Sequence, residues 1–205
     1  VGGLIQEDFE IFFQQIRQYL TAKEQSELFI NWYRKGSLDS GFLASLALIS
    51  SGFSYRKPER LQQARKLLKS LNIQGFDSMP LMGCIDLLMA DVQQAEARFR
   101  SSNDEGLKDW LENYPGETLA ALCDYCCNWL RKDVLPGYRD VDCQSVDLED
   151  WFAHKEVQDY VEHLETKKTL GIAKAGFSFL SSLGSDKYEE QISSDKVSLE
   201  GQLPM

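Results

Sequence analysis

The sequence has few basic residues and no long hydrophobic run. Its 22 Lys and Arg residues are outnumbered by 32 Asp and Glu, which gives a formal net charge of −10. Because binding to nucleic acids or anionic membranes requires clustered cations, this balance argues against both as general partners. The longest nearly apolar stretch, residues 42–49, is far shorter than the roughly 20 residues of a membrane-spanning helix. We therefore predict no nucleic-acid partner and no membrane contact by this chain.

The motifs of common enzyme active sites are also missing. The chain contains no G-x-x-x-x-G-K-[ST], no G-x-G-x-x-G after a strand, no G-x-S-x-G and no H-E-x-x-H. Acidic side chains are plentiful, but a spare Asp or Glu usually belongs to a solvated helix face. The sequence therefore predicts a protein without catalytic activity, cofactor or metal.

Three of the five cysteines lie close together on one predicted helix. A zinc site would need two further ligands at a second Cys or His pair, and a redox Cys-x-x-Cys normally begins a helix after a strand. A metal site and a redox pair are thus the less favoured alternatives, and we predict reduced, metal-free and largely buried thiols. The helical stripe that carries them consists of Leu119, Leu122, Cys123, Cys126, Cys127 and Leu130.

A helical period of apolar residues returns throughout residues 1–168, and no strand pattern interrupts it for long. Capping patterns, prolines and a glycine mark where individual helices begin and end. The predicted boundary residues are Thr21 with Glu24, Gly36, Pro58, Pro80, Pro136 and Asp147. We expect an all-α fold, an irregular helical domain of antiparallel helix pairs.

A weak internal repeat makes this domain partly tetratricopeptide-like. In a tetratricopeptide repeat, small residues at fixed positions let two helices approach closely, and a bulky residue fills the groove beside them. The usual period is 34 and Asp86 stands where an aromatic residue belongs, so a degenerate repeat and an ordinary helical hairpin both remain open. The pattern of Gly52, Tyr55, Ala64 and Leu68 returns 31 positions later as Gly83, Ala95 and Phe99.

Composition divides the chain into a helical domain and a tail. Residues 1–168 form the domain, within which 1–103 (repeat-like) and 104–168 are candidate subdomains. Residues 169–183 carry a partial apolar stripe and are a candidate extra helix, whereas 184–205 is predicted to be a flexible linker. Because the chain does not begin with Met, we expect it to be an internal piece of a longer protein.

One stretch departs from the acidic average. Residues 55–69 carry six of the 22 basic residues and a single acid, Glu59. Leucine and alanine take the inward stripe of this helix, so its cations are expected to rim the stripe and to face outward. Two interpretations are open, a solvated helix face and a docking patch for an acidic peptide or surface.

Dispersed helix-packing positions over most of the chain form a recognisable series. They are Phe12, Phe13, Gln18, Tyr19, Leu20, Thr21, Glu24, Gln25, Leu28 and Phe29, followed by Trp129, Leu130, Val134, Pro136, Arg139, Asp140, Asp147, Leu148, Phe152, Val157 and Tyr160. In this series the chain resembles the central region of a known family, the ZipN proteins of cyanobacteria and their plant relative, the inner-envelope chloroplast-division protein.

The resemblance implies a non-enzymatic cell-division adaptor that binds FtsZ, tethers its filaments to the membrane and recruits other divisome proteins. It also implies the cytoplasmic face of the inner membrane in a cyanobacterium, or the stroma beside the plastid inner envelope, with a transmembrane helix outside this chain. One alternative is a generic tetratricopeptide-like peptide-binding scaffold outside cell division. A helical enzyme or metal protein is the other.

An FtsZ tail peptide that mixes acidic and apolar residues would need an apolar groove with a cationic rim. Residues 55–69 offer this combination most clearly. In the alternative interpretation, the aromatic residues belong to the core and the cations are merely solvated. The candidate partner-binding residues are Tyr55, Arg56, Lys57 and Arg60, with a second cluster of Tyr138, Arg139 and Trp151.

Overall fold

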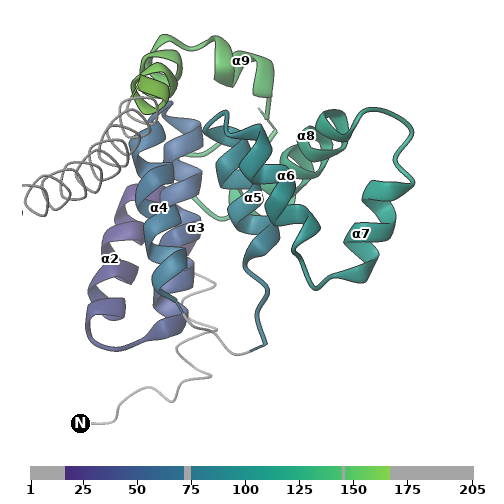
Figure 1. Ribbon diagram of the computed structural model, residues 1–205. Helices are drawn as coiled ribbons and strands as arrows, with labels where there is room; N and C mark the ends of the chain where they lie inside the picture. Colours follow the sequence, from purple (N-terminus) through teal and green to yellow (C-terminus); the bar gives the residue numbers. More distant parts are fainter. Residues whose placement is uncertain (1–16, 72–74, 145, 167–205) are drawn as a thin grey trace, which may run out of the picture. The chain divides into compact units, whose positions relative to one another are not determined.

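The computed structural model describes residues 17–71, 75–144 and 146–166, and every regular element in these ranges is helical (Figure 1). The chain divides into two compact units, Val1–Val161 and Glu162–Met205, and the first contains all labelled helices. This confirms the predicted all-α class. The helices are α2 (Ala22–Arg34), α3 (Leu38–Ser54), α4 (Pro58–Ser70), α5 (Met79–Leu88), α6 (Val92–Arg100), α7 (Glu105–Glu112), α8 (Thr118–Trp129), the π-helix η1 (Leu130–Val134) and α9 (Leu148–Ala153).

Four of the helices, α2, α4, α5 and α9, begin where the sequence predicts. The Thr21 hydroxyl accepts from the Glu24 N–H at 3.1 Å, and the Glu24 carboxylate accepts from the Thr21 N–H at 2.8 Å, which completes the capping box of α2. Pro58 and Pro80 lie in the first turns of α4 and α5. Asp147 caps α9 by accepting from two backbone N–H groups. The capping side chains accept hydrogen bonds from backbone N–H groups that the first turn of a helix leaves unpaired, and a proline in the first turn has no N–H to satisfy.

The helix pairs α3–α4 and α5–α6 turn through the same backbone conformation. Each turn holds a non-glycine residue in the left-handed region, Arg56 with φ 55° and Ala90 with φ 59°. In each turn the N–H of the following residue donates to the carbonyl five positions before it, from Lys57 to Gly52 at 2.8 Å and from Asp91 to Asp86 at 2.9 Å. Arg56 and Ala90 lie 34 positions apart, which is the tetratricopeptide period.

The predicted small residues allow close helix approach, but at different levels of the two pairs. A Cβ atom at Gly52 would lie 3.0 Å from Leu61, near the turn, whereas one at Gly83 would lie 2.7 Å from Phe99, at the far end of α6. The 31-residue spacing in the sequence thus joins positions that are not equivalent. The turns, and not these glycines, define the structural repeat.

A buried ion-pair network joins three helices at Asp86. Its side chain on α5 is fully buried, and its two carboxylate oxygens lie 2.7 Å from Arg65 Nε of α4 and 2.5 Å from Arg98 Nε of α6. Burial raises the pKa of Asp86 above its usual 3.8, and the two guanidinium groups oppose that rise. A buried carboxylate at this position requires both guanidinium groups to compensate for the hydration that it loses. Arg65 therefore points inward, contrary to the expectation that all cations of residues 55–69 face outward.

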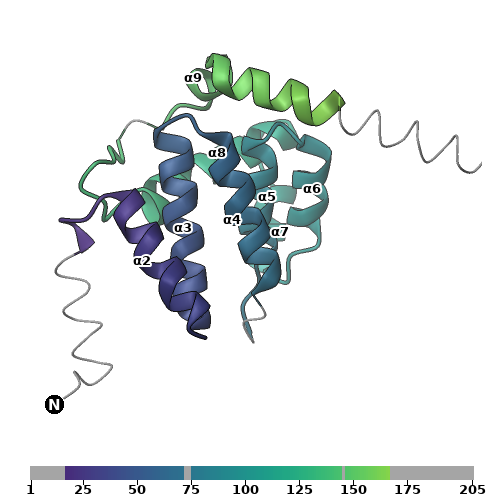
Figure 2. The same ribbon diagram turned by 90° about the vertical axis from the view of Figure 1, so that its left-hand side faces the viewer.

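The segment after η1 returns to the start of α2, and Figure 2 shows it beside that helix. The buried Gln25 donates from Nε2 to the Gly137 carbonyl at 2.8 Å, and Asp140 accepts from the Ala22 N–H at 2.9 Å. Tyr138 packs among Ala22 and other core residues. These contacts hold the beginning of the described fold against a segment far along the chain.

Trp151 fixes α9 on both helix pairs. It is fully buried and stacks on Phe53 of α3, with ring centres 5.2 Å apart. Its indole N–H donates to the Leu88 carbonyl of α5 at 2.9 Å. A short helix of six residues has little stability of its own, so α9 depends on tertiary contacts such as these for its position.

Two of the sequence predictions concern residues outside the described ranges, the extra helix at 169–183 and the linker at 184–205. The division of residues 1–168 into 1–103 and 104–168 stays a prediction. In the described ranges, no helix is long and apolar enough to cross a membrane.

Replacing Asp86 by Asn should lower the free energy of unfolding by about 3–5 kcal/mol, because it leaves two largely buried guanidinium groups without a counter-charge. Urea unfolding of the purified domain measures this. In the matched triple variant Asp86→Leu, Arg65→Met, Arg98→Met, no charge remains uncompensated, so most of the lost stability should return. Equal stability of Asp86→Asn and wild type would show that the network does not hold the helices together.

Asp77 makes stability depend on pH. Partial burial raises its pKa, but hydrogen bonds from the Met79 N–H, the Ser102 hydroxyl and the Asn103 N–H outweigh burial, so its pKa lies below 3.8. The folded state therefore favours the carboxylate, and this stabilisation is present above the unfolded pKa and is lost as pH falls through the folded value. Asp77→Asn should cost about 1–2 kcal/mol at pH 7.

The difference between Asp77→Asn and wild type should begin to shrink as the pH falls below about 4, where Asp77 of the unfolded chain binds a proton, and should be lost as the pH falls through the lower pKa of the folded state. Urea unfolding of both proteins at a series of pH values checks this. A difference that stays constant from neutral to acidic pH would contradict a role for the ionised carboxylate.

Candidate protein-binding surfaces

The structure brings the two predicted residue clusters together at the α3–α4 turn. The Tyr55 hydroxyl donates to Asp140, the neighbour of Arg139, and the Arg56 guanidinium lies 5.8 Å from the ring centre of Trp151. Desolvation, together with the hydrogen bond to Asp140, raises the pKa of Tyr55 to about 12, so its hydroxyl remains a donor at physiological pH. Residues that are distant in the sequence thus share one region of the fold.

The candidate residues of this region differ in exposure. Trp151 is fully buried and Tyr138 is 8% exposed, so the alternative interpretation, that the aromatic residues belong to the core, describes these two. Tyr55 is exposed, and the Arg139 side chain is 61% exposed beside Glu24. Partner binding by the exposed members stays a prediction.

Two of the candidate cations form ion pairs within the fold. The Arg56 side chain, which is 18% exposed, pairs with Asp150 of α9, and Lys57 pairs with Glu156. Arg56 also lies over the ring of Phe53 at 5.5 Å. These two side chains hold the region around α9 against the α3–α4 turn, so they are not simply solvated.

The cations that remain on α4 are Arg60, Lys66 and Lys69, which are called the basic face of α4. At 3.6 residues per turn, Lys66 lies on the side opposite the buried stripe, and Arg60 and Lys69 lie at the two flanks of that side. Lys66 and Lys69 are exposed, and the Arg60 guanidinium lies 5.8 Å above the ring of Tyr55. These three cations form no ion pair with another residue of the described ranges. Lys66 and Lys69 were not among the sequence candidates, because only the fold shows which cations of residues 55–69 are neutralised.

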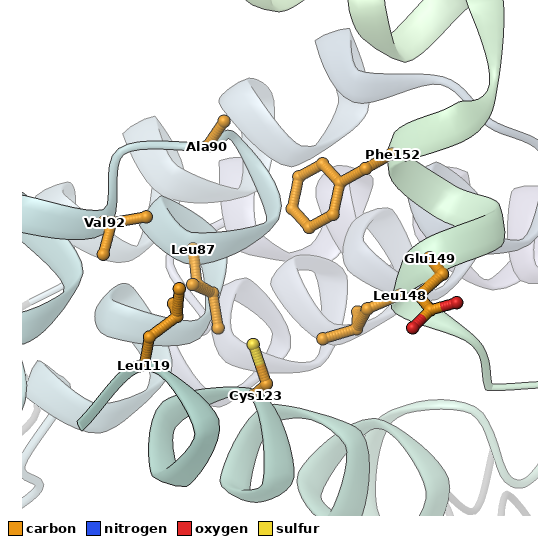
Figure 3. Close-up of a pocket in the computed structure, with 8 residues that line it drawn as sticks. All are labelled: Leu87, Ala90, Val92, Leu119, Cys123, Leu148, Glu149 and Phe152. Carbon is orange, nitrogen blue, oxygen red and sulfur yellow. The ribbon is translucent and has the colours of Figure 1, made fainter. Parts of the chain in front are cut away.

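An apolar groove lies between α5, the start of α6, α8 and α9. Its volume is about 360 Å³, and Leu119 is 45% exposed beside it. Figure 3 shows Leu148 and Phe152 of α9 facing Leu119 and Cys123 of α8 across the groove. Sequence analysis missed this surface because it placed Leu119 on an inward stripe. The lining residues are Leu87, Ala90, Val92, Leu119, Cys123, Leu148, Glu149 and Phe152.

The cysteines of α8 differ in burial. Cys126 is fully buried, and its thiol lies 3.9 Å from the Cys84 carbonyl oxygen, whereas Cys123 and Cys127 are partly buried. Burial raises the pKa of Cys127 to about 11 and that of Cys123 above 9.0, which favours unreactive thiols at neutral pH. In the part of the chain that the structure describes, no group of His, Cys, Asp or Glu could hold a metal ion.

Helix pairs that repeat at 34 residues, as α3–α4 and α5–α6 do, are typical of helical-repeat proteins of the solenoid class. The chain matches the family described as "ARC6: Plastid division regulator alpha solenoid domain" over residues 19–180. It therefore belongs to this family, which is that of the plastid and cyanobacterial division proteins that the sequence resembles. The match does not single out the ZipN branch. No curated protein and no solved structure matches the chain.

Replacing Cys126 by Ser should lower the free energy of unfolding by about 1–3 kcal/mol, because a hydroxyl in this apolar site has no well-placed partner. Thermal or urea unfolding measures the change. Cys143→Ser, at a partly exposed site, is the control and should change stability by less than about 0.5 kcal/mol. A wild-type stability for Cys126→Ser, or stoichiometric zinc in the purified protein, would contradict the core assignment.

Proposed function

We propose that this chain is a non-enzymatic adaptor domain of a cell-division protein, which binds FtsZ and recruits further divisome partners. Membership of the family of plastid division regulators supports a role in division. The proposal places the domain on the cytoplasmic face of a cyanobacterial inner membrane, or in the stroma beside the plastid inner envelope. A helical scaffold of this class acts through its surfaces, because stacked helix pairs present extended side-chain faces to partners.

The basic face of α4 supports the FtsZ contact. A tail peptide of mixed acidic and apolar residues would place its carboxylates against Arg60, Lys66 and Lys69, and an apolar side chain against the exposed ring of Tyr55. Arg60 and Tyr55 already lie together, so this corner of the surface loses little side-chain freedom on binding. Aromatic and Arg residues are those most often found at the energetic centre of protein interfaces.

The internal ion pairs decide which cations can be tested. Reversing the charge of Arg56 would place a carboxylate against Asp150 and would disturb α9, so a loss of binding in that variant would be ambiguous. Arg60, Lys66 and Lys69 carry no such pair in the described ranges. Variants at these three positions separate partner binding from folding.

The triple variant Arg60→Glu, Lys66→Glu, Lys69→Glu should bind a fluorescent FtsZ tail peptide at least about tenfold more weakly than wild type. Binding by wild type should also weaken as salt rises, because exposed charges are screened over about 8 Å at physiological ionic strength. Fluorescence anisotropy titrations at low and physiological salt measure both effects.

A matched control carries the same change of charge elsewhere. In the described structure Lys35, Arg131 and Lys132 are exposed, form no ion pair with another described residue, and lie at the end of α2 and on η1. The variant with Glu at all three should bind the peptide like wild type. Equal binding by all three proteins would remove the basic face as the site. Absence of binding at any salt concentration would remove the FtsZ contact from this domain.

A further inference from the structure

The apolar groove is an unusual surface on a chain with a net charge of −10. Leu119 and Val92 are 45% and 36% exposed at its wall, although burying such side chains would be favourable. An exposed apolar patch of this kind on a soluble domain commonly marks a contact site. Small-molecule pockets usually carry several convergent polar groups, whereas Glu149 is the only charged residue among those that line this groove.

The charge that lines the groove is negative. It comes from Glu149, since Asp86 of α5 is neutralised by Arg65 and Arg98, and Asp150 of α9 by Arg56. Glu149 is exposed at the edge of the groove beside Leu148 (Figure 3), and it forms no ion pair with any other residue that the structure describes. The first cation after α9 along the chain is Lys155. A partner that fills this groove gains most if it brings its own cations.

The shape of the groove favours a helical ligand. Its walls are helices, and no strand edge to which an extended peptide could add is present in the described ranges. An amphipathic helix docks by inserting apolar side chains spaced three or four residues apart into such a groove, while its flanks remain in solvent. Lys or Arg on one flank would then face Glu149.

We propose that this groove binds an amphipathic helix of a protein partner, with an apolar face seated between α8 and α9 and basic residues beside Glu149. This second contact is separate from the basic face of α4, since the two surfaces share no residue. The domain would then hold an acidic peptide on α4 and a basic helix in the groove. The inference does not depend on FtsZ being the ligand of α4.

The probe is a synthetic helical peptide with Leu on one face and Lys on the adjoining flank, labelled for fluorescence anisotropy. Leu119→Asp should weaken its binding at least about tenfold, because it places a charge where an apolar side chain would insert. Leu38→Asp is the matched control, since Leu38 is equally exposed on α3, away from the groove, and it should bind like wild type. Both variants should melt like wild type.

A charge swap tests the polarity of the groove. A second peptide carries Glu in place of each Lys and should bind wild type several-fold more weakly. The Glu149→Lys variant should reverse this order, preferring the Glu peptide. The variant with Glu at Arg60, Lys66 and Lys69 should still bind the Lys peptide, which separates this proposal from the one for α4.

Four peptide-binding results would overturn the proposal. The first is no binding of the Lys peptide to wild type, and the second is equal affinity of Leu119→Asp and wild type for it. The third is a loss of affinity in Leu38→Asp as large as that in Leu119→Asp, which would mean attraction by net charge alone. The fourth is a Glu149→Lys variant that still prefers the Lys peptide. Sedimentation addresses the other occupant: a wild-type dimer that Leu119→Asp converts to a monomer would assign the groove to a second copy of the chain, and the proposal would be wrong.

Discussion

The ion pairs of Asp86 hold α4, α5 and α6 together, and the apolar groove depends on the position of α5 that results. A carboxylate without exposed surface is tolerated only because Arg65 and Arg98 reach it from the two neighbouring helices. α5 in turn presents the Leu88 carbonyl that receives the Trp151 indole, and Leu87, which lines the groove. The network thus places α9 and the groove wall, although it lies in neither surface.

The distribution of cations explains how an acidic chain can offer two surfaces of opposite character. Arg56, Lys57 and Arg65 of the basic stretch are neutralised within the fold, and their partners lie on α5 and around α9. The cations that are left in this stretch, Arg60, Lys66 and Lys69, are spread over the exposed side of α4. Glu149 of α9 forms no ion pair with another described residue. A domain with a basic face and an apolar groove edged by Glu149 would distinguish the two proposed partners by charge.

Local features of the fold could be predicted from the sequence, because neighbouring residues determine them. The capping box at Thr21, the proline at the start of α4 and the cap at Asp147 each act within one helical turn. The partners of Asp86 could not be predicted, since they come from two other helices and Asp86 only looked like a break in the repeat. The burial of Trp151 depends on Phe53, which is distant in the sequence. Leu119 has the same helical spacing as the core residues of α8, so the sequence predicts that it is buried. Its exposure follows from the packing of the helices, which leaves a groove between α8 and α9.

The central claim is that one domain holds two different ligands at two separate surfaces. Titration calorimetry tests this directly, by adding the Lys-flanked helical peptide to domain that is already saturated with the FtsZ tail peptide. The account predicts that the second peptide binds the saturated domain with a stoichiometry near one and with the affinity that it shows for the free domain. Displacement of the first peptide, or failure of the second to bind, would mean that the two ligands share one site and would contradict the account.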